Sequence, residues 1–306
     1  MNAIADLFPG FAEHRIATVG GAEIFLRIGG TGPPLLLLHG YPQSHVCWHR
    51  IAPELARHAT LVMPDLRGYG ASSVPASDAH HKAYSKRAMA EDCVQVMRAL
   101  GHERFIAAGH DRGGRVAYRL ALDHPEAVRA LIPIDILPTA EQWRRMTPER
   151  AVRAYHWAFL AQPYPLPETL IGKEPVYYLE HTLKSWAGPC DLSSFSAEAL
   201  AHYRALMKDP RRVHAVCEDY RAGATLDREL DEADLAAGRK IGCPTFLLWG
   251  SDYLGSGGAS PLDVWRTWCT DLSGTAVASG HFLAEENPQA TLSALIPFLA
   301  AIGCSR

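Results

Sequence analysis

The chain has 306 residues, 48% of them hydrophobic, and a formal net charge of −3. This length favours one α/β domain with a sizeable insertion, and the near-neutral charge excludes a protein that binds nucleic acid or an anionic membrane through a broad basic surface. Seven cysteines without C-x-x-C spacing favour reduced thiols in a cytoplasm over a disulfide framework or a zinc site. The first residues lack the basic region and the apolar region of a secretory signal peptide, and no segment reaches transmembrane length. We therefore expect a cytoplasmic protein.

The first hundred residues alternate between predicted strands and helices. Residues 22–28 alternate weakly between apolar and polar side chains and predict a strand, and the apolar run at 35–38 predicts a buried strand of the parallel kind. A helix is predicted over 46–57, a further strand over 60–63 and a helix over 85–100. Such alternation is typical of a parallel sheet with helices packed on it.

Residues 105–121 combine an apolar run at 105–108, the turn Gly-His-Asp-Arg-Gly at 109–113 and a helical segment at 115–121. This is the strand, sharp turn and helix of the G-x-S-x-G nucleophile elbow, with Asp111 where serine is usual. A carboxylate attacks carbonyl carbon poorly, but it can displace a leaving group from a saturated carbon and form an alkyl ester. The elbow therefore predicts Asp111 as a nucleophile, with an aspartate that only caps the following helix as the alternative.

The loop after the predicted strand at 35–38 has the sequence His-Gly-Tyr-Pro-Gln over residues 39–43. Enzymes with this elbow place one oxyanion-hole amide in that loop and the second on the residue after the nucleophile. We therefore expect the backbone N–H groups of Tyr41 and Arg112 to form the oxyanion hole. A plain Gly-Pro turn is the alternative.

The alternation of strands and helices breaks after a predicted strand at residues 130–134. From about residue 138 to 235 the apolar spacing is mostly helical and the composition is rich in aromatics, which predicts a helical cap inserted over the carboxyl edge of the sheet. Predicted strands resume at 244–250 and 275–278. We therefore expect three segments: a first core part at 1–137, the cap at 138–235 and a second core part at 236–306.

His281 follows the last predicted strand, where it would reach back over the sheet edge and deprotonate a water molecule. The order Asp111, an acid and then His281 is the chain order of nucleophile, acid and histidine in α/β hydrolases. Two acids, Asp135 and Asp252, stand at strand ends, and their spacing does not separate them. A loop histidine in a purely structural hydrogen bond is the alternative for His281.

Several motifs together carry a resemblance to a known family. The elbow Gly-His-Asp-x-Gly-Gly, the His-Gly-Tyr-Pro loop and the Gly-His-Phe after the last strand resemble the haloalkane dehalogenase and epoxide hydrolase branch of the α/β hydrolases. Within that branch, residues 111–115, 135–139 and 155–165 are similar to fluoroacetate dehalogenases. The resemblance implies the α/β-hydrolase fold, in which helices flank a mostly parallel central sheet and a helical cap is inserted, and it implies a homodimer. It also implies Asp135 rather than Asp252 as the acid that orients His281.

Two arginines and three cap residues complete the predicted site. Arg112 and Arg115 lie on one face of the helix after the nucleophile, near its N-terminus, and they suit the carboxylate of a small acid. The alternative is a pair of surface arginines that bind neighbouring acids. For the departing halide, the resemblance implies three donors in the cap: the side chains of His156, Trp157 and Tyr220.

These residues predict the hydrolytic dehalogenation of 2-haloacids such as fluoroacetate, through an aspartyl ester on Asp111, to glycolate and halide. The reaction requires no metal or organic cofactor. The expected ligand is the small haloacid, and besides the second copy of the implied homodimer we expect no partner: neither nucleic acid nor membrane. An epoxide hydrolase would use the same Asp111 and let cap tyrosines protonate the epoxide oxygen, but Arg112 and the adjacent His156 and Trp157 argue against it. A non-catalytic fold that binds a small acid would lack a member of the triad, and this chain retains all three.

Overall fold

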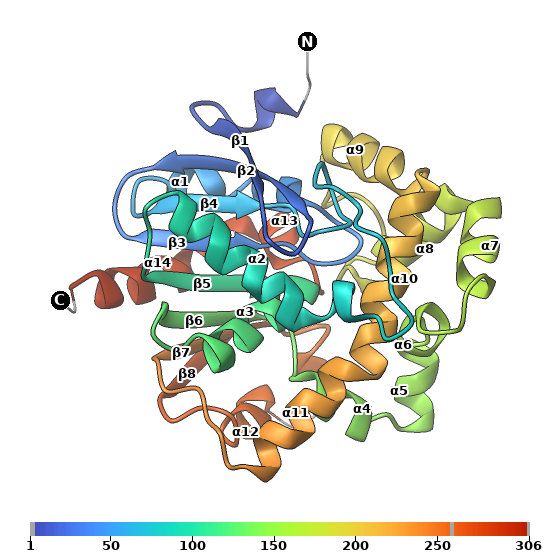
Figure 1. Ribbon diagram of the computed structural model, residues 1–306. Helices are drawn as coiled ribbons and strands as arrows, with labels where there is room; N and C mark the ends of the chain where they lie inside the picture. Colours follow the sequence, from blue (N-terminus) through green and yellow to red (C-terminus); the bar gives the residue numbers. More distant parts are fainter. Residues whose placement is uncertain (1–3, 258–259, 305–306) are drawn as a thin grey trace.

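The computed structural model describes residues 4–257 and 260–304, and a mixed sheet lies at its centre (Figure 1). The strands in this part of the chain are β1 (Ala12–Ala17), β2 (Glu23–Gly30), β3 (Pro34–Leu38), β4 (Thr60–Pro64), β5 (Phe105–His110), β6 (Val128–Ile134), β7 (Thr245–Gly250) and β8 (Leu272–Val277). They form one sheet in the order β1-β2-β4-β3-β5-β6-β7-β8. β2 pairs antiparallel with β1 and with β4, and all other neighbours are parallel. This arrangement confirms the predicted mostly parallel sheet.

The middle strands of the sheet are covered on both faces. Every residue of β5 is buried, and so are the four leucines that end β3. A run of apolar residues without polar alternation is what a parallel strand between two helical layers requires. β1, in contrast, is an edge strand whose residues are mostly exposed. Because its sequence contains no apolar run, it was not among the predicted strands.

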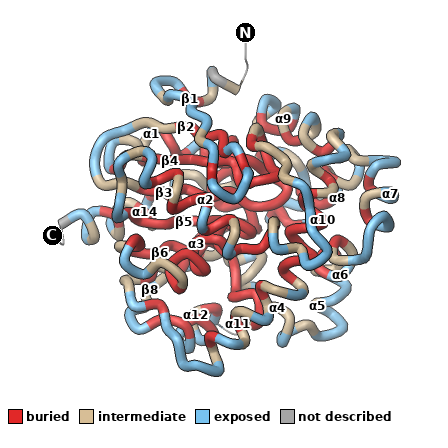
Figure 2. The backbone as a smooth tube through the Cα atoms, in the orientation of Figure 1, coloured by how far each residue is buried: buried red, intermediate tan, exposed pale blue. Residues whose placement is uncertain are grey.

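Helices pack on both faces of the sheet. In Figure 1, α2 (Lys86–Ala99) and α3 (Arg112–Asp123) lie in front of it, whereas α1 (Ala52–Leu55), α13 (Leu283–Glu286) and α14 (Pro288–Cys304) lie behind it. Figure 2 shows that the buried backbone is concentrated in the strands between these layers. The remaining short elements of the core are η1 (Ala5–Leu7), η2 (His45–Trp48), η3 (Lys82–Tyr84), η4 (Gly255–Gly257) and α12 (Pro261–Trp265). Within the described part of the chain, no helix has the length and apolarity needed to cross a membrane.

The predicted helix over residues 46–57 is wrong. The structure has the 3-10 turn η2 and the four-residue helix α1 in its place. Pro53 lies inside the predicted range, and a proline in a helix interior lacks the N–H donor and clashes with the carbonyl group four residues earlier. Proline is tolerated in the first turn of a helix, and Pro53 occupies that place in α1.

The chain between β6 and β7 is helical, and we call residues 139–236 the cap segment. Its helices are α4 (Thr139–Arg144), α5 (Pro148–Arg153), α6 (His156–Leu160), α7 (Leu166–Lys173), α8 (Pro175–Trp186), α9 (Ala197–Met207), α10 (Pro210–Ala224) and α11 (Leu226–Ala236). In Figure 1 most of them lie beside the carboxyl ends of the parallel strands, which is where open α/β sheets bind ligands. The division into segments 1–137, 138–235 and 236–306 stays a prediction.

Candidate active site

The predicted nucleophile lies on a strained turn between β5 and α3. Asp111 has φ 47° and ψ −115°, a backbone conformation that residues with a side chain rarely adopt. A Cβ on Gly109 would lie 2.3 Å from the carbonyl oxygen of Gly113, so the close approach of strand and helix requires glycine there. The side chain of Asp111 makes no capping hydrogen bond to α3. The turn therefore directs this carboxylate away from the helix, which contradicts the alternative of a simple helix cap.

Asp111 is buried against the loop after β3. The backbone N–H of Tyr41 donates to Oδ1 of Asp111 over 3.0 Å, and a Cβ on Gly40 would lie 2.5 Å from the Cβ of Asp111. One of the two amides predicted for the oxyanion hole thus already contacts the side chain on which an ester carbonyl would form. The predicted role of the Arg112 amide stays a prediction.

His281 lies between two carboxylates. Its Nδ1 donates to Oδ2 of Asp135 over 2.5 Å, and its Nε2 lies 3.8 Å from Oδ2 of Asp111. The other oxygen of Asp135 accepts the backbone N–H of Gly250 at 2.9 Å. Asp252, the second acid that the spacing allowed, is exposed and accepts a hydrogen bond from its neighbour Ser251. The geometry therefore distinguishes the two acids and places Asp135 against the histidine.

The charges of this group depend on one another. Burial by itself raises the pKa of Asp111, but its contact with the His281 cation and the charge of Arg112 hold this pKa well below its usual range. Burial lowers the pKa of His281, whereas the carboxylates of Asp111 and Asp135 raise it to about 9. At neutral pH the site therefore holds an ionised carboxylate at Asp111 beside an imidazolium at His281.

Arg112, directly after the nucleophile, is fully buried and paired with an acid of the cap segment. Its Nε and Nη2 donate to the carboxylate of Asp219 over 3.1 and 2.5 Å. Its guanidinium carbon lies 4.1 Å from the ring centroid of Tyr220. Nη1 is buried and has no hydrogen-bond partner in the described part of the chain. This atom is therefore free to donate to a ligand.

Arg115 is buried as well, but no carboxylate lies within 4.0 Å of it among residues 4–257 and 260–304. Its Nη1 donates to the carbonyl oxygen of Leu137 and to Oγ1 of Thr139, over 2.9 and 3.2 Å. Its guanidinium carbon lies 4.4 Å from the centroid of the Trp157 ring, and Nε has no partner within the same residues. Since both arginines are buried, the alternative of two surface arginines is wrong.

The structure brings together the three side chains predicted to bind halide, which we call the cap donors: His156, Trp157 and Tyr220. The ring centroid of Tyr220 lies 5.8 Å from that of His156 and 5.8 Å from that of Trp157. Nδ1 of His156 and the hydroxyl of Tyr220 are buried without a partner among the described residues. Burial lowers the pKa of His156 to about 3, so this ring is neutral. Unpartnered buried polar atoms are costly, and a ligand that accepts from them would remove that cost.

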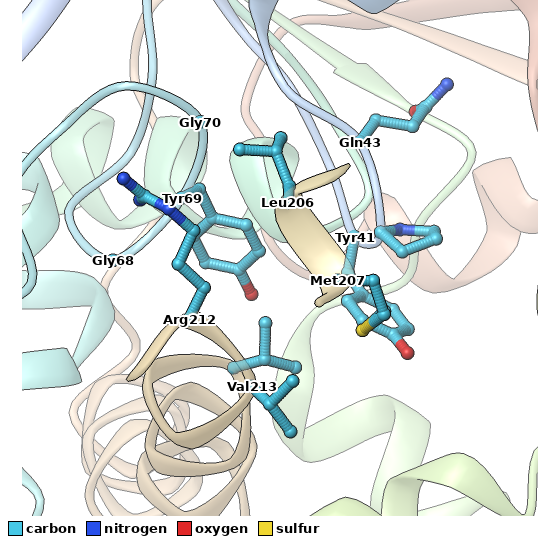
Figure 3. Close-up of a pocket in the computed structure, with 11 residues that line it drawn as sticks. Tyr41, Gln43, Gly68, Tyr69, Gly70, Leu206, Met207, Arg212 and Val213 are labelled. Atoms are coloured by element: carbon cyan, nitrogen blue, oxygen red, sulfur yellow. The ribbon is translucent and has the colours of Figure 1, made fainter. Parts of the chain in front are cut away.

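A small cavity lies beside this group, where the cap segment meets the core (Figure 3). It is lined by residues 41–43, by the turn at 68–70 and by residues of α9 and α10. Its volume of about 30 Å³ has room for a water molecule rather than a haloacid. The residues with unpartnered donors near Asp111, which are Arg112, Arg115, His156 and Tyr220, are not among those that line this cavity. No three His, Cys, Asp or Glu side chains in residues 4–257 and 260–304 are arranged to hold a metal ion.

Two residues next to the predicted site were not predicted. Asp219 binds Arg112, and the Trp186 ring at the end of α8 lies 4.4 Å from the ring centroid of His156 and 5.4 Å from that of His281. An acid directly before the predicted donor Tyr220 is a signal that could have found Asp219. Trp186 is one of many aromatics in the cap segment, and its spacing does not distinguish it.

Comparison with known proteins gives the following. The alpha/beta hydrolase fold family matches residues 33–288. The chain is 43% identical to a fluoroacetate dehalogenase from Burkholderia sp, over 96% of this chain and 95% of the relative. It is 31% identical to a soluble epoxide hydrolase from Corynebacterium sp. (strain C12), over 94% of this chain and 98% of the relative. A solved structure from Nostoc sp PCC 7120, described as an alpha/beta hydrolase, has a TM-score of 0.91 and 51% identity, and the match covers 94% of this chain and 98% of that chain.

Proposed function

Because the chain belongs to the α/β-hydrolase family, we propose that it is a hydrolase that removes halide from 2-haloacetates and releases glycolate. The membership confirms the predicted fold class, and the similarity to a fluoroacetate dehalogenase supports this substrate class. The observation that carries the proposal is the pair of buried guanidinium groups, Arg112 and Arg115, with unpartnered N–H groups beside the ionised Asp111. A small acid held by these groups would bring its carbon 2 to the carboxylate of Asp111.

In the first step of the proposed mechanism, Asp111 attacks carbon 2 of the haloacetate from the side opposite the halogen. A carbon–oxygen bond forms, the carbon–halogen bond breaks, and the halide leaves with the electron pair. The low pKa of Asp111 keeps the nucleophile ionised. The arginines hold the substrate carboxylate, and the cap donors stabilise the charge that develops on the halide.

In the second step, water attacks the carbonyl carbon of the ester on Asp111. The ester is neutral, so one of the two carboxylates that raise the pKa of His281 is lost and this pKa falls. His281 therefore releases its proton to solvent. The neutral ring then accepts a proton from the attacking water, and Asp135 stabilises the imidazolium that forms. The oxyanion forms near the N–H of Tyr41, and its collapse expels glycolate, which takes the proton from His281. Asp111 is left as a carboxylic acid, and transfer of its proton to the neutral His281 regenerates the carboxylate and the imidazolium.

Epoxide hydrolysis is the second candidate. It would use the same Asp111 and His281, and an epoxide hydrolase is among the relatives. The buried hydroxyls of Tyr41 and Tyr178 have no hydrogen-bond partner in the described residues and could protonate an epoxide oxygen. A neutral epoxide, however, would leave the buried cation of Arg115 without a counter-charge, and this favours the acid substrate.

Incubation with fluoroacetate, chloroacetate and styrene oxide separates the two candidates. Release of halide and glycolate supports dehalogenation, whereas diol formation without halide release would replace it by epoxide hydrolysis. A single turnover in oxygen-18 water, followed by peptide mass spectrometry, tests the covalent step. The label is expected in the carboxylate of Asp111, and label found only in glycolate would mean that water attacks carbon 2 directly.

Tyr220→Phe is expected to slow the turnover of fluoroacetate more than that of bromoacetate. Fluoride is a small and strongly basic leaving group, so it depends most on an O–H donor as it departs. A hydrogen bond to a charged group contributes about 1.5–3 kcal/mol, which corresponds to a loss of about 10- to 100-fold with fluoroacetate. We expect a change below about 3-fold with bromoacetate in the same halide-release assay. Tyr177→Phe, at a 70% exposed tyrosine of the cap segment, is the control. Equal losses with both substrates would remove Tyr220 from the halide site.

Asp135→Asn is expected to reduce kcat by about 10⁴-fold, because an amide cannot hold the histidine in the required tautomer or stabilise the imidazolium. Asp252→Asn, at the second acid that the sequence allowed, is the matched variant and is expected to stay within about 2-fold of the unaltered enzyme. Steady-state halide release measures both. If Asp252→Asn lost as much kcat as Asp135→Asn, the hydrogen bond to His281 would not identify the acid that acts in catalysis.

We also propose a cytoplasmic location and a homodimer. The location is supported by the free thiols of Cys47, Cys93, Cys190, Cys217, Cys243 and Cys269. The homodimer is supported by the resemblance alone, and sedimentation of the purified protein tests it.

A further inference from the structure

Asp219 joins the cap segment to three parts of the core. It lies on α10 directly before Tyr220, and its side chain is fully buried. Its carboxylate accepts hydrogen bonds from Arg112 at the start of α3, from Nζ of Lys86 at the start of α2 and from the hydroxyl of Tyr69, the last over 2.7 Å. Asp219 therefore does more than hold the cap segment against the core, because one of its three donors, Arg112, is predicted to bind the substrate.

The contact with Asp219 determines which atoms of Arg112 remain available. Nε and Nη2 donate to the Asp219 carboxylate, and Nη2 also donates to the Asp219 backbone carbonyl over 2.8 Å. A guanidinium is planar, so a two-point contact of this kind sets the direction of the remaining nitrogen. That nitrogen, Nη1, is the one without a partner in the described residues. Arg112 can therefore meet a substrate with Nη1 alone.

Asp219 also compensates the charge of Arg112. Lys86, the second cation at Asp219, lies 3.8 Å from a second buried acid, Asp227, which also accepts its backbone N–H. The two cations and the two acids form a buried group in which each positive charge has a negative neighbour. Arg115 lies outside this group and has no carboxylate within 4.0 Å in the part of the chain that the structure describes.

We propose that Asp219 is a positioning residue that aims Nη1 of Arg112 at the substrate carboxylate and cancels the charge of Arg112, so that the site accepts acids with a single carboxylate. Of the two arginines, Arg115 alone has no carboxylate within 4.0 Å among the described residues, and its charge is the one that the substrate balances. A dicarboxylate of similar size would bring a second negative charge that no cation is free to balance, and it is rejected for that reason. This inference rests on the proposed dehalogenation.

Asp219→Asn tests the proposal, together with the double variant Asp219→Asn and Lys86→Met. The single variant leaves two buried cations with one acid, Asp227, and is at risk of unfolding, whereas the double variant removes one charge of each sign. We expect kcat for chloroacetate to fall about 100-fold, because Arg112 no longer holds the carboxylate in the reactive position. The KM is expected to change by less than about 3-fold, because the positive charges that attract the substrate remain.

Two further readouts separate positioning from support of the fold. Inhibition by malonate, relative to acetate, is expected to strengthen at least about 10-fold. Arg112 has lost the carboxylate that it contacts, and the remaining acid of the group, Asp227, does not lie within 4.0 Å of it in the described residues. The loss in kcat is expected to be equal for fluoroacetate and chloroacetate, since Asp219 acts on the carboxylate and not on the halide. A purely structural role would instead reduce the number of active sites, measured by single-turnover halide release, and leave kcat per site and the malonate ratio unchanged.

Each outcome has one meaning. Unchanged kcat per active site in the double variant, or an unchanged ratio of malonate to acetate inhibition, overturns the inference. A loss confined to fluoroacetate would mean that Asp219 acts through its neighbour Tyr220, and this also overturns it. If the unaltered enzyme releases no halide from any haloacetate, the proposed function fails first, and that result is distinct from a failure of Asp219 alone.

Discussion

The His281→Ala enzyme is expected to release about one halide per active site and then stop, with Asp111 alkylated. The first step needs only the carboxylate of Asp111, which the charge of Arg112 still favours in its ionised form, and the donors around the substrate, none of which is removed. The second step loses the base that takes the proton from water, which slows ester hydrolysis by about 10²–10⁴-fold. The ester therefore accumulates instead of turning over.

Intact-protein and peptide mass spectrometry after incubation with chloroacetate measure this outcome. We expect a mass gain of one carboxymethyl group on the peptide that contains Asp111, and none in the unaltered enzyme at the end of turnover. His102→Ala is the matched control, because His102 precedes the amino end of β5, whereas Asp111 follows its carboxyl end. An inactive His281→Ala enzyme without any adduct would contradict the two-step mechanism.

The same variant links stability to pH. The pKa of His281 is about 9 in the folded protein and about 6.5 in an unfolded chain, so the folded state holds this proton more tightly. The stabilisation by the imidazolium between two carboxylates is fully present below about pH 6.5 and is lost as the pH rises through about 9. The Tm of the unaltered enzyme should therefore exceed that of His281→Ala by more at about pH 6 than at about pH 9.5. A gap independent of pH would contradict the charge state assigned to this histidine.

The parts of the site that the sequence predicted are those tied to strand ends. Asp111 and Asp135 each follow a buried strand, whereas His281 follows the largely exposed edge strand β8. The carboxyl ends of these parallel strands meet at one edge of the sheet. An apolar run marks such a strand locally, so neighbouring residues suffice to place its end. The edge strand β1 contains no apolar run and is a strand only because it pairs with β2, so the sequence did not predict it.

The contacts of the cap segment depend on packing between distant residues, and no local pattern carries that information. Asp219 meets Arg112 across 107 positions of the chain, and the hydroxyl of Tyr69 reaches it across 150. The sequence predicted one role, the binding of the substrate carboxylate, for two arginines that lie three positions apart on one helix. Only the packing of α10 against α3 makes them unequal, because the acid that meets Arg112 does not reach Arg115.

Arg115→Met is expected to reduce activity and to raise stability. The buried guanidinium has only neutral acceptors, and the cost of removing a charge from water is not recovered until a substrate carboxylate binds. Methionine can fill the space beside Trp157 without that cost. The carbonyl of Leu137 loses one donor, but Thr139 keeps the hydroxyl of Tyr118 at 2.9 Å. We therefore expect a net gain of about 1 kcal/mol in the free energy of unfolding.

The expected loss in kcat/KM for chloroacetate is about 10²–10³-fold, because the substrate carboxylate is buried without its main counter-charge. Arg112→Met is the matched variant. It should also lose activity, but it leaves Asp219 with Lys86 and Tyr69 as its remaining donors and should lower the free energy of unfolding by about 3 kcal/mol.

Urea unfolding of the two variants, read beside their halide-release rates, compares the arginines directly. If both arginines served only to bind the substrate, both replacements would raise the free energy of unfolding. If both served only the fold, both replacements would lower it. The two changes in the free energy of unfolding are expected to have opposite signs only if the protein pairs one cation with an acid and leaves the other for the ligand. Destabilisation of Arg115→Met by as much as Arg112→Met would mean that Arg115 is compensated within the fold, and the single-charge selectivity of the site would lose its basis.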